Sequence, residues 1–422
     1  MSKEKAVKIK TALISVSDKT GLDQLSKYLD KNNIKIISTG GTGEHIKKLG
    51  INVTKVSDLT NFPEIMNGRV KTLNPLIYGG LLNRAKVDDE ILDELGIKNI
   101  DLIVINLYPF EETIKKQNLK EIDAIENIDI GGPSMIRASA KNFYSKTIVT
   151  NPNDYEILIN ELENNSCSIA YLTRKSFALK AFRLIASYDL NILNYFDNPI
   201  KNNELPEKLF LELNKENDLR YGENPHQKGG LYSYDSVSHK SLSGAKVFQG
   251  KELSYNNYLD TNSAMKCCQE FDDPCCVIVK HVNPCGVAIS DNITKAYEKA
   301  FQTDPESSFG GVIAVNRKVD KDFASKLINN QFVEVIISPG YTSSAIEAFK
   351  NKENIRVISV EEFKKSKVNF QIQSIDGGFL IQEDDHKIIL EEELKFVTKK
   401  KPNENEIKDL IFAWKVAKYV KS

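Results

Sequence analysis

The chain has 422 residues, of which 41% are hydrophobic and 27% charged, and its formal net charge at pH 7 is -1. This balance excludes a general electrostatic attraction to nucleic acid or to a membrane surface, so any phosphate site has to be built locally. The length predicts two to three domains. The start is charged and no run of about 18 apolar residues occurs, so we expect a cytoplasmic protein that does not cross a membrane.

Short apolar runs alternate with helical stretches over the first 150 residues. Strands are expected at residues 11–16, 34–37, 53–56 and 102–105, and helices at 21–29 and 44–49. This alternation predicts a parallel sheet with helices on its faces. Residues 151–188 are expected to be mainly helical. The Asn-, Asp- and Pro-containing stretch 191–206 then predicts a domain junction.

The second half also reads as α/β, with new strands and two clear helices. The strands are expected at 231–234, 277–279, 312–315 and 333–337, and the helices at 262–270 and 293–302. The apolar run 277–279 is typical of a strand buried on both faces, and it leads directly into Lys280 and His281. Because Pro and Gly interrupt a ladder, we expect the Asn-Pro-Cys-Gly sequence at 283–286 to form a turn.

Two polar turns follow the first two expected strands. Ser17, Asp18 and Lys19 come before one helix, and Thr39, Gly40, Gly41 and Thr42 come before the next. Free N–H groups at helix starts bind anions, although Asp18 or Thr20 acting only as a helix cap would also explain the first turn. Neither turn matches a P-loop or a dinucleotide fingerprint, so we expect a nucleotide monophosphate or a small phosphate ester.

Three further segments of the first half carry polar side chains. They supply Arg69, Lys71 and Thr72, then Asn106 and Tyr108, and finally Asp129, Ile130 and Lys141. The last segment begins as a glycine turn with Pro133 suited to a first helical turn, so Asp129 at the helix start and Lys141 along one face are a plausible acid and base. A solvated basic loop, a packed tyrosine and a surface ion pair are the alternatives.

Lys280 and His281 are the main candidates in the second half. A histidine can accept a proton at neutral pH while a neighbouring ammonium stabilises an oxyanion, which suits attack on a carbonyl. A capped strand end with a solvated lysine is the alternative. Arg220 and Tyr221 lie in a constrained polar loop, and Gly310 ends another.

The six cysteines lack the spacing of a disulfide framework or of a zinc site. They are Cys167, Cys267, Cys268, Cys275, Cys276 and Cys285, with no Cys-x-x-Cys pair. We therefore expect reduced thiols and no metal.

The ordered motifs resemble the family of bifunctional purine-biosynthesis enzymes that carry phosphoribosylaminoimidazolecarboxamide (AICAR) formyltransferase and IMP cyclohydrolase. The motifs are SVSDKTGL, STGGT, RVKTLNP, NLYPF, IDIGGPSMIRASAKN, LRYGENPHQ, QGKELSYNNYLD, VIVKHVNPCG, SSFGGVIA and FAWKVAKYVKS. The resemblance runs from Ser15 to the end of the chain. It implies a methylglyoxal-synthase-like parallel-sheet domain at 1–195 and a cytidine-deaminase-like α/β formyltransferase domain at 196–422.

For the first domain, the resemblance implies dehydrative closure of formyl-AICAR to IMP. Lys71, Tyr108, Asp129 and Lys141 would line the reacting atoms, with Lys141 as the proton carrier. The nucleotide would contact Ser17, Asp18, Lys19, Thr39, Gly40, Gly41, Thr42, Arg69, Thr72, Asn106 and Ile130.

For the second domain, the resemblance implies formyl transfer from 10-formyltetrahydrofolate, a reduced-folate co-substrate, to AICAR. His281 would accept the amine proton and Lys280 would stabilise the oxyanion. Arg220 and Tyr221 would contact AICAR, whereas Gly310 and Glu334 match folate-side positions. The family uses no metal and forms homodimers, with the transferase sites between subunits.

The sequence departs from the family pattern in two places. Asn74 and Tyr78 stand where the family commonly has histidines, so those histidines are spectators or cyclohydrolase binding is altered here. The family sequence also continues beyond FAWKVAKYVKS, which leads us to expect a transferase domain lacking its C-terminal part. Cyclohydrolase activity would then be intact and formyl transfer impaired or absent.

Two other functions fit parts of the sequence. One is a cyclohydrolase alone, and the other is a non-catalytic anion-sensing module attached to a dimerisation domain. A sensor needs phosphate loops but no reactive side chains, so the presence of Lys71, Tyr108, Asp129 and Lys141 argues against sensing.

Overall fold

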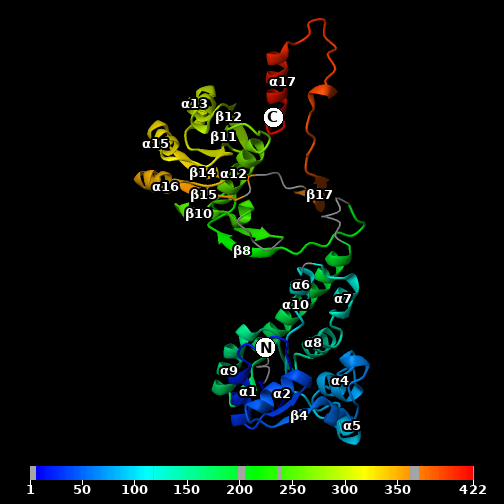
Figure 1. Ribbon diagram of the computed structural model, residues 1–422. Coiled ribbons are helices and arrows are strands. Elements are labelled where there is room, and N and C mark those ends of the chain that lie inside the picture. The colour runs from blue at the N-terminus through cyan, green and yellow to red at the C-terminus, as the bar shows by residue number, and fades with distance from the viewer. Residues whose placement is uncertain are drawn as a thin grey trace. The chain divides into compact units, whose positions relative to one another are not determined.

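The computed structural model describes residues 6–116, 118–197, 205–234, 240–361, 363 and 370–421. The chain forms two compact units that divide between residues 199 and 200, and each is described by itself (Figure 1). The junction expected at 191–206 falls partly outside the described residues. Within the described ranges, no helix combines the length and the apolarity needed to cross a membrane.

Unit 1 contains a five-stranded sheet in which every neighbouring pair is parallel. Its order is β4 (Val53–Lys55), β3 (Lys35–Ser38), β2 (Thr11–Ser15), β5 (Leu102–Ile105) and β6 (Thr147–Val149). The parallel sheet expected from the sequence is confirmed, and the expected strand bounds differ by only one or two residues. A parallel sheet brings the carboxyl ends of β2, β3 and β5 to one edge.

Helices cover both faces of this sheet, because side chains alternate across each strand. Ala12 and Ile14 face one apolar cluster with α1 (Leu22–Lys31), α2 (Gly40–Lys48) and α9 (Tyr155–Asn164). Leu13 faces the other with α4 (Pro75–Leu82), α8 (Gly131–Lys141) and α10 (Tyr171–Phe196). The remaining elements are β1 (Val7–Lys8), α3 (Val56–Thr60), η1 (Met66–Gly68), α5 (Asp89–Glu94), α6 (Phe110–Ile114), α7 (Glu121–Glu126), η2 (Pro152–Asp154) and β7 (Ser168–Ile169).

A buried lysine lies at the opposite edge of the sheet, where β5 and β6 begin. Lys146 is 1% exposed, and its ammonium donates to Asn83 Oδ1 at 2.7 Å and also to Asn99 Oδ1. Asn99 donates to Asp101, whose carboxylate accepts the N–H groups of Lys10 and Thr11. Burial lowers the pKa of Lys146 to about 8, and the charge of Asp101 opposes that shift.

The unfolding free energy of unit 1 should therefore rise between pH 8 and 10.5 by a contribution from Lys146. In that window the unfolded lysine holds its proton and the folded lysine releases it, so raising the pH favours the folded state. At about 1.4 kcal/mol per pKa unit, the contribution is ~3 kcal/mol. Urea titrations at pH 7.5 and 10 should show a smaller rise for Lys146→Met than for the parent; equal rises would contradict the burial.

Unit 2 contains a six-stranded mixed sheet with two helical layers. Its order is β10 (Lys246–Gln249), β15 (Arg356–Ser359), β14 (Val333–Ser338), β13 (Gly311–Val315), β11 (Cys275–Lys280) and β12 (Asn283–Ile289). The pairs among β13, β14 and β15 are parallel, and the other pairs are antiparallel. The second half is thus α/β, as expected from the sequence.

Alternate residues of β11 point to the two layers. Ile278 joins the cluster formed with α13 (Ile293–Thr303), α15 (Lys321–Asn330) and α16 (Ser343–Phe349), and Val277 joins the cluster with α12 (Tyr255–Cys268). The other elements are β8 (Asn214–Leu219), β9 (Gly229–Ser233), η3 (Leu242–Gly244), α14 (Pro305–Ser308), η4 (Lys350–Lys352), β16 (Phe370–Ile375), β17 (Gly378–Glu383), η5 (Glu391–Glu393) and α17 (Glu404–Ala417).

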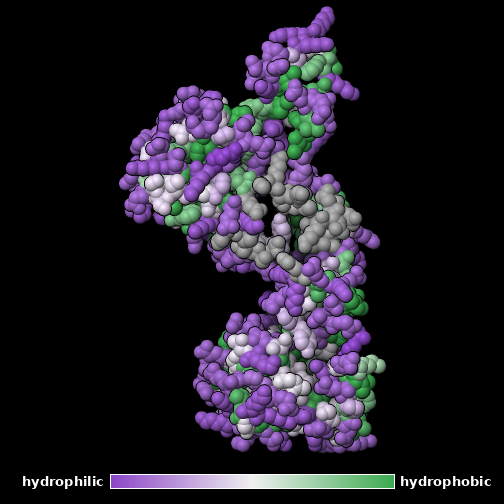
Figure 2. Space-filling model, in the orientation of Figure 1, coloured by the Kyte–Doolittle hydropathy of each residue, from purple (hydrophilic) through white to green (hydrophobic). Residues whose placement is uncertain are grey.

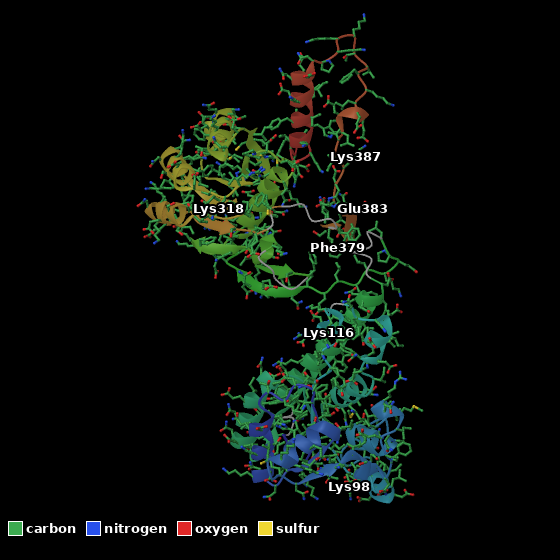
Figure 3. The ribbon with its side chains drawn as sticks, viewed as in Figure 1. Lys98, Lys116, Lys318, Phe379, Glu383 and Lys387 are labelled. Carbon is green, nitrogen blue, oxygen red and sulfur yellow. The ribbon has the colours of Figure 1, made fainter. Side chains whose placement is uncertain are left out.

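The segment from β16 to α17 exposes many apolar side chains. Figure 2 shows hydrophobic residues gathered around α17, and Figure 3 shows Phe379, Glu383 and Lys387 on β17 and just after it. Phe379 is 68% exposed and Trp414 is 64% exposed. Just after α17, the Tyr419 hydroxyl donates at 2.6 Å to Oε1 of Glu270, which lies two residues after α12. Trp414 is the single tryptophan of the chain, so its fluorescence reports on unit 2.

The expected turn at 283–286 is wrong, because those residues begin β12. The turn that joins β11 to β12 consists of His281 and Val282, and Lys280 pairs directly with Asn283. The ladder shifts register between Ile278 and Val279, and this irregularity accommodates Pro284. Proline is tolerated here because β12 is an edge strand.

Four of the six cysteines are fully buried on α12 and β11: Cys267, Cys268 and Cys275 pack in the cluster between α12 and the sheet, and Cys276 packs in the opposite cluster with α13, α15 and α16. Cys267 and Cys268 lie on the helix, and Cys275 and Cys276 lie on the strand. All six thiols are free in the structure. Burial raises the pKa of Cys276 well above its usual value, so its reactive thiolate form is suppressed.

Candidate active sites

The carboxyl ends of β2 and β3 in unit 1 carry the predicted anion site. Ser15 Oγ and Thr39 Oγ1 are 2.8 Å apart and share a hydrogen bond. Thr42 Oγ1 accepts the Val16 N–H at 3.1 Å and donates to the Val16 carbonyl at 3.0 Å. The Thr39 side chain therefore does not cap α2, and the first-turn N–H groups of Gly40 and Gly41 carry no side-chain cap. These N–H groups are the part of the motif best placed for an anion.

The loop after β2 is shaped by Asn106 at the end of β5. Asn106 Oδ1 accepts the N–H groups of Ser17 at 2.6 Å and Asp18 at 3.1 Å, while its Nδ2 donates to the Asp18 carbonyl at 2.8 Å. Its amide therefore positions the loop that carries Ser17, Asp18 and Lys19. The Lys19 ammonium lies back on the same loop, 3.4 Å from the Ser17 carbonyl.

Asp18 forms a local turn with Thr20 and does not cap α1. The N-cap of α1 is Gly21, so the alternative in which Asp18 or Thr20 caps that helix is wrong. The Asp18 carboxylate accepts the Thr20 hydroxyl at 2.7 Å and the Thr20 N–H at 2.9 Å. Both bonds lower the pKa of Asp18, and the bond from the Thr20 hydroxyl has the larger effect. The loop therefore keeps a negative charge.

A second polar cluster lies at the start of α8. Asp129 Oδ1 accepts the Gly132 N–H at 2.9 Å, and the Asp129 N–H donates to the Tyr188 hydroxyl at 2.7 Å. Burial raises the pKa of Asp129, whereas the Gly132 bond and the positive charge of Lys71 oppose that rise. Thr72 is buried against Gly131, as its Oγ1 lies 2.8 Å from where a Gly131 Cβ would be. The structure thus brings Lys71, Thr72 and Asp129 together.

Tyr78 adds a hydroxyl to this cluster that the sequence comparison treated only as a missing histidine. Its hydroxyl oxygen is buried and has no hydrogen-bond partner among the described residues. Burial raises the pKa of Tyr78, the nearby Ser134 hydroxyl lowers it, and the negative charge of Asp129 raises it. Asn74 has a different task, because its Oδ1 caps α4 by accepting the Leu76 N–H at 2.9 Å.

Tyr78→Phe should leave the stability of unit 1 unchanged or raise it by up to about 1 kcal/mol. The Tyr78 hydroxyl forms no well-aligned hydrogen bond with a described residue, and its neighbour Ser134 already donates to the Ile130 carbonyl, so removing the Tyr78 hydroxyl relieves a desolvation cost and loses only a weak contact. Thermal melting should show this, with Tyr188→Phe as the matched control, because that hydroxyl is bonded to Asp129 and its loss should lower the melting temperature. A marked destabilisation by Tyr78→Phe would contradict the assignment.

Within the described residues, no contact joins Arg69, Tyr108 or Lys141 to this cluster, and Ile130 adjoins it only through the backbone, as the N-cap of α8. Arg69 makes an exposed ion pair with Glu126, Nε to Oε2 at 3.6 Å, and Ile130 is 59% exposed. Tyr108 is 49% exposed just before α6. Lys141 ends α8, ten residues beyond Gly131, which at 1.5 Å per residue is about 15 Å along the helix. Asp129 and Lys141 therefore lie at opposite ends of α8, and their joint role stays a prediction.

The candidate site of unit 2 is the turn after β11. The Lys280 ammonium donates to the Phe309 carbonyl at 3.0 Å, which places it beside Gly310. His281 has φ 53° and Val282 has φ 66°, so both residues of the two-residue turn are left-handed. This geometry suits the twist of a tight hairpin, but a β-branched residue adopts it only under strain.

The turn is held by α12. Asp260 Oδ1 accepts the Val282 N–H at 2.7 Å, and Ser263 Oγ donates to the Val282 carbonyl at 2.9 Å. Burial raises the pKa of Asp260, and the bonds from Val282 and His281 together with the charge of His281 oppose that rise. Neither Asp260 nor Ser263 was a predicted site residue. The QGKELSYNNYLD motif ends at Asp260, but nothing in its spacing indicates a contact with the turn.

Gly310 and Glu334 lie at the same end of the sheet as Lys280. Val279 pairs with Val312, and Gly311 pairs with Val333, so the end of β11 adjoins the beginnings of β13 and β14. Glu334 makes a 2.7 Å ion pair with Arg356, and this bond occupies one oxygen of its carboxylate.

Arg220 and Tyr221 follow β8, with the guanidinium 5.6 Å from the centre of the Tyr221 ring. Asn256 Nδ2 donates to the Glu223 carbonyl at 3.3 Å, which ties this loop to α12 one turn before Asp260. Much of the polar motif before α12 is structural, because Ser254 and Asn257 form a capping box with two 3.1 Å bonds. That part of the motif explains the start of the helix without a ligand.

No cluster of three or more His, Cys, Asp or Glu side chains within the described ranges is arranged to hold a metal ion. The two units thus define an α/β protein with polar sites at the ends of both sheets.

Comparison with known sequences gives the class. The AICARFT/IMPCHase bienzyme family matches residues 139–422, and the MGS-like domain family matches residues 21–134. The first match covers more than half of the chain, so the chain belongs to the AICARFT/IMPCHase bienzyme family. The protein is accordingly a purine-biosynthesis enzyme of the formyltransferase and cyclohydrolase kind. Among solved structures, the crystal structure of ForH is 31% identical over 45% of this chain and 100% of that chain, with a TM-score of 0.41.

Proposed function

We propose that unit 2 transfers a formyl group from 10-formyltetrahydrofolate to AICAR and that unit 1 closes formyl-AICAR to IMP. The observation that carries the proposal is the Lys280–His281 pair in a chain of this family: Lys280 ends β11 beside Gly310, and His281 begins the strained turn. The polar cluster of Lys71, Thr72 and Asp129 at the start of α8 supports the second step. The reacting molecules are AICAR, formyl-AICAR, IMP and reduced folate, and neither step requires a metal.

In the transfer step, the amine nitrogen of AICAR attacks the formyl carbon. His281 accepts a proton from that nitrogen, and Lys280 stabilises the negative charge that develops on the formyl oxygen. Collapse of the tetrahedral intermediate breaks the bond to the folate nitrogen, which leaves with a proton. Lys280 uses one N–H for the Phe309 carbonyl, so its other N–H groups are available for the oxyanion.

In the closure step, the carboxamide nitrogen attacks the formyl carbon and water is lost. The step needs one proton delivered to the departing oxygen and another removed from nitrogen. Asp129 is suited to exchanging a proton because burial raises its pKa, and the charge of Lys71 stabilises its anion. The first turn of α2 would hold the nucleotide phosphate. Tyr108 and Lys141 are proposed from the family resemblance as further catalytic residues, and a homodimer is proposed on the same ground.

Two variants separate the activities. His281→Asn should lower kcat of formyl transfer by about 100-fold or more while leaving ring closure of supplied formyl-AICAR intact. Asp129→Asn should do the reverse. Matched controls are the exposed His386→Asn in unit 2 and Asp123→Asn in unit 1, which should change neither rate.

The parent protein decides among the alternatives. Ring closure without formyl transfer would reduce the proposal to a cyclohydrolase alone. Binding of formyl-AICAR with neither activity would favour an anion-sensing module and refute both catalytic assignments.

A further inference from the structure

We propose that Asp260 is a positioning residue for the formyl-transfer site, because its carboxylate holds the His281–Val282 turn in the left-handed conformation that places Lys280 and His281. The inference rests on the proposed function of unit 2 and extends it to a residue on another element. Asp260 does not touch the reacting atoms in this assignment. It acts through the backbone of the turn.

The turn needs an external support. Two consecutive left-handed residues without a glycine are unusual, and Val282 is β-branched, the residue type that tolerates positive φ least. Asn and Gly normally occupy such hairpin positions. If the support were removed, the backbone would relax toward negative φ and carry the His281 imidazole away from its present position.

Asp260 and Ser263 provide that support from one face of α12. They are three residues apart, which places them on the same side of a helix. Asp260 accepts the Val282 N–H at 2.7 Å and Ser263 donates to the Val282 carbonyl at 2.9 Å, so both polar groups of the Val282 backbone are fixed. The His281 N–H also faces the Asp260 carboxylate and opposes the rise in its pKa. Both N–H groups of the turn therefore converge on one side chain.

The support is itself anchored. The helix begins with the Ser254–Asn257 capping box and packs Ala264, Cys267 and Cys268 into the apolar cluster under the sheet. Because α12 cannot shift without disturbing that cluster, the position of Asp260 is transmitted to the turn. The same helix is tied to the Arg220–Tyr221 loop through Asn256. One rigid element thus positions groups assigned to both the acid–base chemistry and AICAR binding.

The test combines a loss with a specific rescue. Asp260→Ala should lower kcat/KM for formyl transfer by about 100-fold, as expected for a misplaced catalytic group. Asp260→Asn keeps an acceptor oxygen for the Val282 N–H and should lose less than about 10-fold. Val282→Gly removes the strain, so the Asp260→Ala/Val282→Gly double variant should recover about 10-fold or more relative to Asp260→Ala.

The control is Asp320→Ala in the same unit. Asp320 Oδ1 also accepts a backbone N–H, that of Phe323 at 2.9 Å, but at the start of α15. It should lower the melting temperature without lowering kcat/KM. Activity of Asp260→Ala equal to the parent, absence of rescue by Val282→Gly, or an equal loss in Asp320→Ala would each overturn the proposal.

Hydrogen exchange separates this inference from the proposed function. In Asp260→Ala, amide exchange in residues 277–285 should become faster than in the parent, and Asp260→Asn should restore part of the protection. If the parent shows no formyl transfer, the proposed function fails, and the exchange result alone then decides whether Asp260 holds the turn. An unchanged exchange rate in Asp260→Ala would show that Asp260 does not hold the turn.

Discussion

Gly286→Ala is expected to destabilise unit 2 by about 3 kcal/mol or more and to abolish formyl transfer. A Cβ at this position of β12 would overlap the carbonyl oxygen of Ala300 on α13 and lie 2.9 Å from its carbonyl carbon. Both obstacles are backbone atoms, so no side-chain rotation relieves them. The helix would have to move away from the sheet, which exceeds ordinary overpacking costs of about 1–3 kcal/mol.

Thermal melting followed by Trp414 fluorescence measures this effect, since that residue lies in unit 2. Gly340→Ala is the matched control, because among the described residues outside its chain neighbours no atom lies within 4 Å of its added Cβ, and it should melt at the parent temperature. Ring closure by unit 1 in the same samples tests whether the damage stays in unit 2. Melting of Gly286→Ala at the parent temperature would show that α13 does not approach β12 this closely.

Gly132→Ala is expected to lower ring closure by about 100-fold through displacement of Asp129. A Cβ at this position would overlap Asp129 Oδ2 and lie 2.9 Å from Leu107 Cδ2. The carboxylate would have to leave the Gly132 N–H that it now accepts at 2.9 Å. Because an aspartate side chain can rotate, the expected stability loss is smaller than for Gly286→Ala, about 1–3 kcal/mol.

Steady-state ring closure with formyl-AICAR measures the loss, and thermal melting measures the accompanying destabilisation. Gly41→Ala serves as the stability control, because Gly41 also lies in the first turn of a helix and its added Cβ would meet no described atom within 4 Å beyond its own helix. If Gly132→Ala closes the ring at the parent rate, Asp129 does not act from its observed position.

The parallel sheet of unit 1 could be predicted because its strands are short, apolar and separated by helices of ordinary length. The segments that form β2, β3 and β5 are mostly apolar, so their sequences alone indicate that they are buried. The prediction of an anion site at their ends rests on the same pattern, since glycines and hydroxyl residues follow two successive strands. The pattern did not indicate which hydrogen bonds each polar side chain makes. The Thr42 hydroxyl, for example, bonds to the backbone N–H and carbonyl of Val16.

Other features depended on contacts between distant segments. Pro284 predicts the end of a strand ladder. It is accommodated in β12 because β12 is an edge strand, and the strand order that makes it so is not encoded in the local sequence. Asp129 precedes α8 and Lys141 ends it, so the length of the helix separates the two side chains. Asp260 meets Val282 across 22 residues of chain, and no periodicity relates the two.

The four buried cysteines make the scaffold of the proposed transfer site chemically observable. They lie on α12 and β11, the two elements that hold and deliver the His281–Val282 turn. Cys267, Cys268 and Cys275 belong to the cluster between α12 and the sheet, so their alkylation rate under native conditions measures how often this layer opens, whereas Cys276 reports on the opposite layer. Measuring the alkylation rate of the intact protein with and without bound AICAR would thus show how often the packed elements open and whether AICAR changes that frequency.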